Sequence, residues 1–463
     1  MKTNYSGKKV IVIGAARQGL AISRFLSGKG AQVILTDTRP AADLASASAA
    51  LTDLPVEFAF GGHPESLLEG ADLICVSGGV PLTIPFIMTA RNQGIKLSND
   101  SQIFLEECPA SVVGITGSAG KSTTTALVGL MAQKHFEVKN SQHRAWVGGN
   151  IGNPLIDNLD QMDEDDLVVM ELSSFQLELM TSSPQVAAVL NITPNHLDRH
   201  SSMQAYIEAK SRILRYQHQG DVAVLNRDDE GSWDLLSEVR TDVISFGKKA
   251  PGYRQSGTYV DKGQIMLQIG NDKLKMLPVE WINLRGEHNL YNALAACAIA
   301  AGATIGLPGI QLGIETFDGV PHRLELVREL NDVSWYNDSI ATAPERTIAA
   351  IDSFDEPIVL LLGGRDKNLP WDKLAHLIRR RVSRVVIFGE AGDLIAEAIG
   401  PKKPGQAMHS VVRCATLQEA IKTAHNQAEA GDVVLLSPGC TSYDAFKDFE
   451  ERGEAFRKWV NEL

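Results

Sequence analysis

The segment over residues 114–123, Gly-Ile-Thr-Gly-Ser-Ala-Gly-Lys-Ser-Thr, constrains the fold more than any other. It follows the β-branched run 111–113 and precedes a helical pattern over 124–133. A strand, a glycine loop, Gly-Lys-Ser and a helix together predict a nucleotide-phosphate loop, because backbone N–H groups and the helix N-terminus attract phosphate oxygens. Lys121 is expected to reach the terminal phosphates, and the Ser122 hydroxyl to hold Mg²⁺.

The loop is a variant, since the strict pattern needs glycine at Ile115 and this chain has it at Gly114. An ordinary glycine-rich turn is the alternative, but the strand-to-helix context favours the phosphate loop. The expected ATP contacts along it are Gly114, Thr116, Gly117, Ser118, Ala119, Gly120, Lys121, Ser122 and Thr123.

Length and composition narrow the class of protein. The 463 residues are too many for one core and suggest about three domains. A net charge of −12 argues against nucleic-acid binding. Five scattered cysteines fit a reducing compartment, and no apolar run approaches the ~20 residues of a membrane helix or forms a signal sequence. We therefore expect a cytoplasmic enzyme with no nucleic-acid or membrane partner.

Residues 1–108 predict a Rossmann-like βαβ domain, with strands at 10–14, 33–37 and 73–77. Its loop runs from Gly14 to Gly19, and Ala16 occupies the place of the second fingerprint glycine. Asp37 follows at the interval of a ribose-binding acid. A nicotinamide site, and hence a dehydrogenase, is weakly supported, whereas another nucleotide-like ligand with its phosphate at the helix N-terminus fits.

Residues 109–319 predict the central domain, a parallel sheet like that of P-loop ATPases. The strand 166–172 carries Glu171 at its carboxyl end, beside the phosphate loop, where an acid commonly ligates Mg²⁺. A paired structural carboxylate is the alternative. The strand 186–190 leads into a loop that contains His196, which would lie at the same sheet end. The alternation over 258–277 predicts a small β-meander, and an Ala-rich helix follows from Gly286 to about 301.

Residues 320–463 predict a third, Rossmann-like α/β domain with strands at 358–362, 384–388 and 432–436. Its strand-exit loops, 337–342, 363–367 and 437–442, hold the polar residues typical of a binding site. We expect these loops to converge, because ligands bind at the carboxyl ends of parallel strands.

The whole chain resembles the Mur ligases of peptidoglycan precursor synthesis, in particular the branch that adds D-glutamate to UDP-N-acetylmuramoyl-L-alanine. The resemblance spans all three domains and rests on specific segments: the phosphate loop, Gly148-Gly149-Asn150-Ile151-Gly152, Glu171-Leu172-Ser173-Ser174-Phe175-Gln176-Leu177, Asn195-His196-Leu197-Asp198-Arg199, and Asp444-Ala445-Phe446-Lys447-Asp448-Phe449-Glu450.

The resemblance implies ATP-dependent amide bond formation through an acyl phosphate, with two Mg²⁺ ions. Lys121 matches the lysine that stabilises the phosphates. Ser122 and Glu171 match the ligands of one ion, and His196 with a carbamoylated Lys210 matches those of the second. The implied catalytic set is Lys121, Glu171, His196 and Lys210.

The remaining implied contacts fall into four groups. Adenine and ribose contacts match Asn289, Asn292, Arg323 and Asp338. The uridine-diphosphate site matches Ala16, Arg17, Asp37, Thr38, Arg39 and Gly79, and the muramoyl end matches Asn150 and Ser173. Glutamate contacts match Thr342, Lys367, Ser442 and Phe449. The implied partners are UDP-N-acetylmuramoyl-L-alanine and glutamate, and we expect a monomer.

One departure bears on the amino acid. Where the family often has a lysine facing the glutamate side-chain carboxylate, this chain has Ile340. Arg365 or another residue would have to compensate, and a ligase that adds L-glutamate to the same substrate is the alternative. A non-catalytic nucleotide-binding module is a further alternative, disfavoured by the complete set of expected phosphate and metal residues. Folylpolyglutamate synthetase relatives share the phosphate loop but not this first domain.

Overall fold

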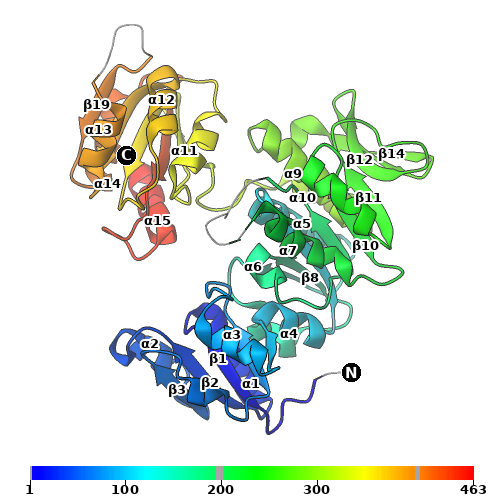
Figure 1. Ribbon diagram of the computed structural model, residues 1–463. Helices are drawn as coiled ribbons and strands as arrows, with labels where there is room; N and C mark the ends of the chain where they lie inside the picture. Colours follow the sequence, from blue (N-terminus) through cyan, green and yellow to red (C-terminus); the bar gives the residue numbers. More distant parts are fainter. Residues whose placement is uncertain (1–2, 194–199, 201, 402–406) are drawn as a thin grey trace. The chain divides into compact units, whose positions relative to one another are not determined.

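The computed structural model describes residues 3–193, 200, 202–401 and 407–463. The chain divides into two compact units, Met1–Ile282 with His288–Phe317, and Asn283–Glu287 with Asp318–Leu463. Over the described residues there are three sheets, two in the first unit and one in the second (Figure 1). The expected three-domain α/β class is confirmed. No helix in the described parts of the chain combines the length and apolar character that crossing a membrane requires.

The first sheet is parallel and has the order β3-β2-β1-β4-β5. Helices cover both faces of this sheet, so its strands are apolar on both sides. In the strand 9–13, for example, Val10 and Val12 pack into one apolar cluster, and Ile11 and Ile13 pack into another. The strands are β1 (Lys9–Ile13), β2 (Gln32–Asp37), β3 (Val56–Phe60), β4 (Leu73–Val76) and β5 (Lys96–Ser98), and the helices are α1 (Arg17–Gly28), α2 (Ala45–Ala49), α3 (Pro85–Asn92) and α4 (Asp100–Glu107). The strand order reverses between β1 and β4, so a ligand would bind beside the end of β1.

The second sheet has the order β14-β13-β12-β11-β10-β9-β6-β8-β7. It is parallel from β7 to β12, and β12–β14 form the expected antiparallel meander, seen in green in Figure 1. The strands are β6 (Ser111–Thr116), β7 (Ala145–Gly149), β8 (Leu167–Glu171), β9 (Val186–Val189), β10 (Val222–Asn226), β11 (Asp242–Phe246), β12 (Ser256–Asp261), β13 (Gln264–Ile269) and β14 (Asp272–Pro278).

The α-helices of this domain are α5 (Lys121–Val138), α6 (Ser174–Leu177), α7 (Met203–Arg215), α8 (Glu230–Trp233), α9 (Glu287–Gly302) and α10 (Leu307–Glu315). Two of them were indicated most strongly by the sequence: α5, after the phosphate loop, and the Ala-rich α9. Strands β8, β6 and β9 are neighbours, so their carboxyl ends, at Glu171, Thr116 and Val189, lie along one edge.

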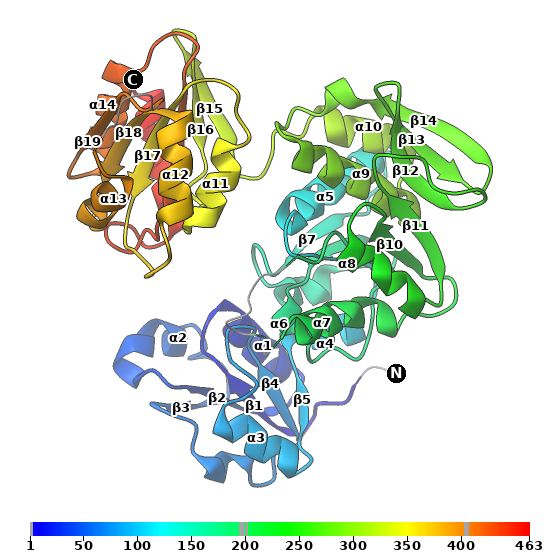
Figure 2. The same cartoon turned by 45° about the horizontal axis from the view of Figure 1, so that its top comes forward.

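The third sheet has the order β15-β16-β20-β17-β18-β19, with only the edge strand β15 antiparallel within the described residues (Figure 2). The strands are β15 (Glu325–Leu330), β16 (Val333–Asn337), β17 (Ile358–Gly363), β18 (Val382–Phe388), β19 (Ser410–Arg413) and β20 (Val433–Gly439), and the helices are α11 (Pro344–Ile351), α12 (Asp372–Arg381), α13 (Gly392–Ile399), α14 (Leu417–Gln427) and α15 (Phe449–Asn461).

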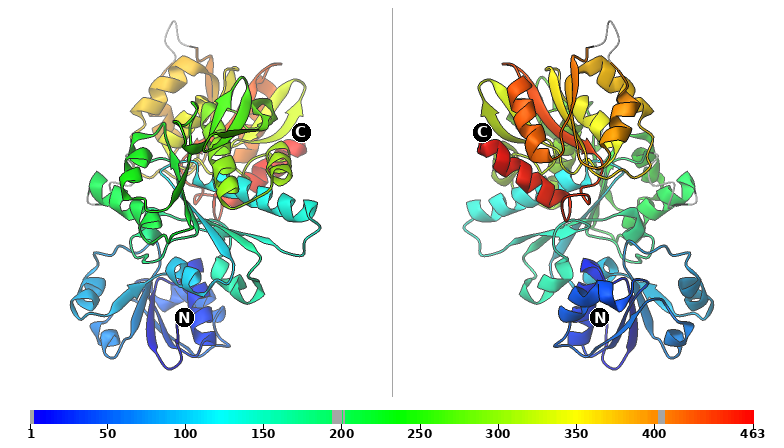
Figure 3. Two further views of the ribbon diagram at one scale, coloured as in Figure 1. Left: turned by 90° about the vertical axis from the view of Figure 1, so that its right-hand side faces the viewer. Right: turned by 90° about the vertical axis from the view of Figure 1, so that its left-hand side faces the viewer.

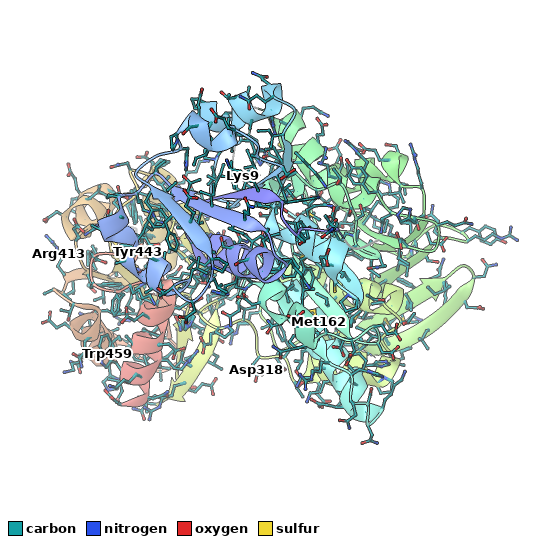
Figure 4. All side chains as sticks on the ribbon, turned by 90° about the horizontal axis from the view of Figure 1, so that it is seen from below. Lys9, Met162, Asp318, Arg413, Tyr443 and Trp459 are labelled. Carbon is teal, nitrogen blue, oxygen red and sulfur yellow. The ribbon has the colours of Figure 1, made fainter. Side chains whose placement is uncertain are left out.

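Two apolar clusters cover the two faces of this third sheet, one under α11–α13 and one under α14 and α15. The side views of Figure 3 show these helices, in yellow to red, around their sheet. Figure 4 labels Trp459 on α15 and Asp318, where the main segment of the second unit begins. The central neighbours β16, β20 and β17 are parallel, so their exit loops meet at one edge.

Candidate functional site

The phosphate loop has the geometry that its sequence predicts. Residues 117–120 connect β6 directly to α5, and Gly120 precedes the helix with φ +82°. A Cβ on Gly120 would lie 2.4 Å from the Asn292 side-chain oxygen, so both the backbone conformation and the space require glycine. The first-turn N–H groups of α5 lack helical acceptors by geometry and are oriented for an anion.

Two residues at the start of the motif have structural roles. Gly114 lies inside β6, where a Cβ would be 2.4 Å from Pro184, so close packing accounts for this glycine. Thr116 donates its hydroxyl to the Leu172 carbonyl at 2.8 Å and ties β6 to the end of β8. The structure therefore points to 117–123 as the part of the loop that can approach a phosphate.

Asn191, which directly follows the buried strand segment 186–190, braces this loop and was not among the predicted site residues. Its side chain accepts from the Ala119 N–H at 2.8 Å and donates to the Ala119 carbonyl at 3.1 Å. Its carbonyl also accepts from the Ser118 N–H at 2.9 Å. An asparagine at the exit of the strand beside the loop is the sequence signal that points to this role.

Two lysines meet beneath the loop. The side-chain nitrogens of Lys121 and Lys210 both donate to the Gly117 carbonyl, at 2.8 and 2.9 Å. Lys210 is 1% exposed and lies 4.7 Å from the centre of the Tyr206 ring. Burial lowers the pKa of Lys210 well below its ordinary value, Lys121 lowers it further, and Glu171 opposes the shift. Two lysine side chains on one carbonyl, one of them the Lys121 ammonium, make this a site for negative charge.

Glu171 has an unsatisfied acceptor at the same edge. It is 2% exposed, and one carboxylate oxygen accepts from the Asn150 side chain at 2.8 Å. The other, Oε2, has no hydrogen-bond partner among the described residues. A buried carboxylate oxygen without a donor suits a hard cation such as Mg²⁺, and Ser122, at the second position of α5, offers a hydroxyl.

The predicted second metal site cannot be assembled from the structure alone, because His196 lies outside the described residues. Among the described residues, no group of three or more histidine, cysteine, aspartate and glutamate side chains is arranged to hold a metal ion. Of the predicted metal ligands, Ser122, Glu171, His196 and Lys210, Glu171 is the one acidic residue that the structure describes.

At the carboxyl edge of the first sheet, Asp37 anchors the predicted uridine-diphosphate site. It accepts from the Ala15 N–H at 2.8 Å and from the Arg39 guanidinium at 2.9 and 3.0 Å. These bonds, led by the one from Arg39, hold the pKa of Asp37 well below its usual range. Thr38 is exposed next to it.

The α1 N-terminus forms the other side of this predicted site. Ala16 is the N-cap of α1 in extended conformation, so its methyl group is tolerated where the fingerprint has glycine. Arg17 donates to the Gly152 carbonyl at 3.4 Å and connects the first sheet to the segment that carries Asn150. Gly79 lies exposed after β4. The N–H groups at the start of α1 are oriented for an anion, as a bound diphosphate would require.

Ser173, expected near the muramoyl group, caps a helix. Its hydroxyl accepts from the Gln176 N–H at 3.3 Å, and the Gln176 side chain accepts from the Ser173 N–H at 3.0 Å, which closes a capping box at α6. Asn289 and Asn292, expected near adenine and ribose, are buried on α9 and bonded to each other at 2.9 Å. Asn292 also lies behind Gly120, so it supports the phosphate loop.

In the second unit, the three strand-exit loops converge as expected. Arg365 and Thr441 form a backbone bridge between two of them. The Lys367 ammonium donates to the Thr342 hydroxyl at 3.3 Å, joining the first and second loops. Ser442 is buried in the third loop, and Phe449 begins α15, where its carbonyl accepts from Ser339 at 2.8 Å.

Arg452, on α15, connects the same three loops. It was not among the residues predicted from the sequence. Its guanidinium is fully buried and donates to the carbonyls of Ser339 at 2.8 Å, Cys440 at 3.2 Å and Gly363 at 3.4 Å. Burial lowers its pKa to about 10, with Asp444 opposing. A single arginine in a C-terminal helix carries no sequence signal for this role, because two of its partners, the Ser339 and Gly363 carbonyls, are 113 and 89 residues away in the chain.

Asp338, expected near the ribose, is a buried carboxyl at this edge. It accepts from the Ser437 hydroxyl at 2.8 Å and from the Leu324 N–H at 3.3 Å. Burial raises its pKa to about 7, although Ser437 and the charge of Arg323 oppose the shift. Arg323 therefore lies within electrostatic range of Asp338, which brings these two predicted residues together.

Family models cover most of the chain. A model described as the Mur ligase MurD-like N-terminal domain matches residues 8–99, one described as the Mur ligase middle domain matches 115–300, and one described as the Mur ligase glutamate ligase domain matches 322–440.

Relatives match over the full length. Proteins named UDP-N-acetylmuramoylalanine–D-glutamate ligase include one from Pelotomaculum thermopropionicum, 39% identical over 100% of this chain and 99% of its own. Another, from Thermoanaerobacter sp. strain X514, is 37% identical over 99% of both chains. Among solved structures, UDP-N-acetylmuramate-alanine ligase MurC from Thermotoga maritima has a TM-score of 0.58 at 19% identity, covering 98% of this chain and 99% of that chain.

The MurF ligase from Thermotoga maritima in complex with ADP gives a TM-score of 0.55 at 17% identity and covers 100% of both chains. These two structures support the fold, and the full-length relatives together with the three family models establish the relationship. The chain belongs to the Mur ligase family of ATP-dependent, amide-bond-forming ligases.

Proposed function

We propose that this ligase adds D-glutamate to UDP-N-acetylmuramoyl-L-alanine in peptidoglycan precursor synthesis. The substrate carboxylate attacks the γ-phosphate of ATP, giving an acyl phosphate and ADP. The glutamate amine then displaces phosphate and loses a proton, leaving the amide. The observation that carries the proposal is the meeting of Lys121 and Lys210 on the Gly117 carbonyl of the phosphate loop. Relatives named for this reaction, which match over the full length of the chain, support it.

The residues of the phosphate loop would act mainly by positioning and electrostatics. Lys121 would leave the Gly117 carbonyl for the phosphate oxygens, where charge develops in the transition state. Ser122 and Glu171 would hold one Mg²⁺, which when bound neutralises phosphate charge. The unsatisfied Oε2 of Glu171 supports this assignment.

Lys210 would be carbamoylated and would hold a second Mg²⁺ together with His196. Carbamate formation joins the neutral amine to CO₂ and releases a proton, so it converts a cation into an anionic oxygen ligand. Deep burial beside Lys121 favours that neutral form of the amine.

The remaining assignments follow the same proposal. The domains would be 1–108 for the UDP substrate, 109–319 for ATP and 320–463 for the amino acid. Asn150 would lie near the muramoyl end, as its bond to Glu171 suggests. The enzyme would work in the cytoplasm as a monomer.

The test is an amino-acid panel. Phosphate release is measured with ATP, Mg²⁺, UDP-N-acetylmuramoyl-L-alanine and each amino acid, including both glutamate enantiomers. We expect D-glutamate to give the highest kcat/KM. Preference for L-glutamate would support the alternative ligase, which Ile340 leaves open, and phosphate release that needs no amino acid would refute the proposal.

A further inference from the structure

The amino-acid edge of the third sheet carries two arginines besides Lys367, the cation that the family pattern anticipates. Glutamate brings two carboxylates, and this chain has Ile340 where a lysine would face one of them. The side chains of Arg346, Arg365 and Lys367 all come from the loops and helix start at this edge.

The Arg365 side chain is already paired with an acidic residue of the protein. Its guanidinium forms an ion pair with the Glu390 carboxylate at 2.7 Å, and both side chains are exposed. A substrate carboxylate would have to displace Glu390 to reach it. Arg365 therefore does not supply the missing charge.

Arg346 lies against the position of the missing lysine. It is in the first turn of α11, and its guanidinium donates to the carbonyl of Ile340 itself at 3.3 Å. Within the described part of the chain, no acidic side chain comes within 4.0 Å of the charged groups of Arg346 or Lys367.

The acids at the same edge are bonded elsewhere. Asp366 accepts from the Asn368 N–H at 2.7 Å and from the Trp371 ring at 3.2 Å, and Asp338 accepts from Ser437. Among the described residues, neither cation is paired with an acid, and the charge of Arg346 lowers the pKa of Lys367, after the larger effect of burial.

We propose that Arg346 binds the side-chain carboxylate of the incoming glutamate, in place of the lysine that Ile340 replaces, with Lys367 as the second cation of the pocket. Two unpaired cations about one loop match a dicarboxylate, and a planar guanidinium can hold a carboxylate through two parallel bonds. This inference rests on the amino-acid site of the proposed function and names a residue that determines its specificity.

The experiment compares three variants with the glutamate enantiomer that the panel selects. Arg346→Ala is expected to raise the KM for glutamate about tenfold or more, with the KM values for ATP and the UDP substrate within about threefold. Arg365→Ala, the matched control, removes an arginine from the same edge and should leave all three KM values within about threefold. Adding Ile340→Lys to Arg346→Ala should restore much of the glutamate KM, because it returns a cation to the site.

Lys367→Ala distinguishes the role of Arg346 from the location of the amino-acid pocket. If Lys367→Ala raises the glutamate KM and Arg346→Ala does not, the role of Arg346 is overturned and the pocket stands. If neither variant changes it, the amino acid binds elsewhere, and both the pocket and the role of Arg346 fall. An equal rise in all three KM values for Arg346→Ala would mark a structural effect and would also overturn the inference.

Discussion

Among single residues, Lys210 is the one whose environment differs most from what a helix lysine usually has. It is 1% exposed, on α7, and it donates to the phosphate loop at Gly117. We predict that Lys210→Ala lowers kcat about a hundredfold or more, because an anionic metal ligand would be lost. Acetate or formate should partly restore activity in the variant but not in Lys121→Ala, as measured by phosphate release. Full activity of Lys210→Ala would contradict the carbamate assignment.

We also predict, at the scale of single residues, that the Asp338 carboxyl makes the stability of the protein depend on pH. Burial raises its pKa to about 7, so the folded protein holds this proton above the pH at which the unfolded chain loses it. The contribution of the protonated Asp338 carboxyl to the stability of the folded protein is present below about pH 4 and is lost as pH rises through 7. The melting temperature of Asp338→Asn relative to wild type should therefore increase between pH 5 and 8, by a few degrees, corresponding to about 1 kcal/mol or more. A constant difference across this range would refute the buried-carboxyl description.

At the scale of elements, α15 connects the exit loops of β16, β17 and β20 through Arg452. We predict that Arg452→Ala destabilises the second unit by about 3–5 kcal/mol, because buried carbonyls lose their donors. Arg457→Ala is the matched control on the same helix. Arg457 pairs with Glu325 and Glu454 near the surface, so its loss should cost about 1 kcal/mol or less. Calorimetric melting of both variants is the measurement, and equal costs would contradict the role assigned to Arg452.

At the scale of the whole molecule, each of the two units has its own sheets and apolar clusters. The residues expected to bind glutamate, Thr342, Lys367, Ser442 and Phe449, all belong to the second unit. Glutamate at about a hundred times its Kd should therefore stabilise the transition of the second unit by about 2.7 kcal/mol and leave that of the first unchanged. Calorimetry of the full chain, with succinate as a control dicarboxylate lacking the amine, tests this. Equal shifts of both transitions would contradict it.

Strong local patterns predicted much of the architecture. The strand–loop–helix at 111–138, the meander at 258–277 and the apolar strands were predicted correctly, because a buried parallel strand is apolar throughout and a glycine with φ +82° leaves few substitutes. Asn191 and Arg452 escaped prediction because they bond to distant segments. Asn191 bonds to Ala119, 72 residues away, and Arg452 bonds to Gly363, 89 residues away, and no local pattern encodes such pairs.

By itself, the sequence determined the fold class, the strand–loop–helix that carries Lys121, and the convergence of the exit loops, since alternation, glycine placement and strand-end chemistry are local properties. Only the tertiary structure decided that Gly114 packs against Pro184 and that Lys210 is buried beside Lys121. It also decided that Arg365 is paired while Arg346 faces no acid of the described chain. Burial and charge pairing depend on which distant segments meet, and that is set by packing rather than by any one stretch of residues.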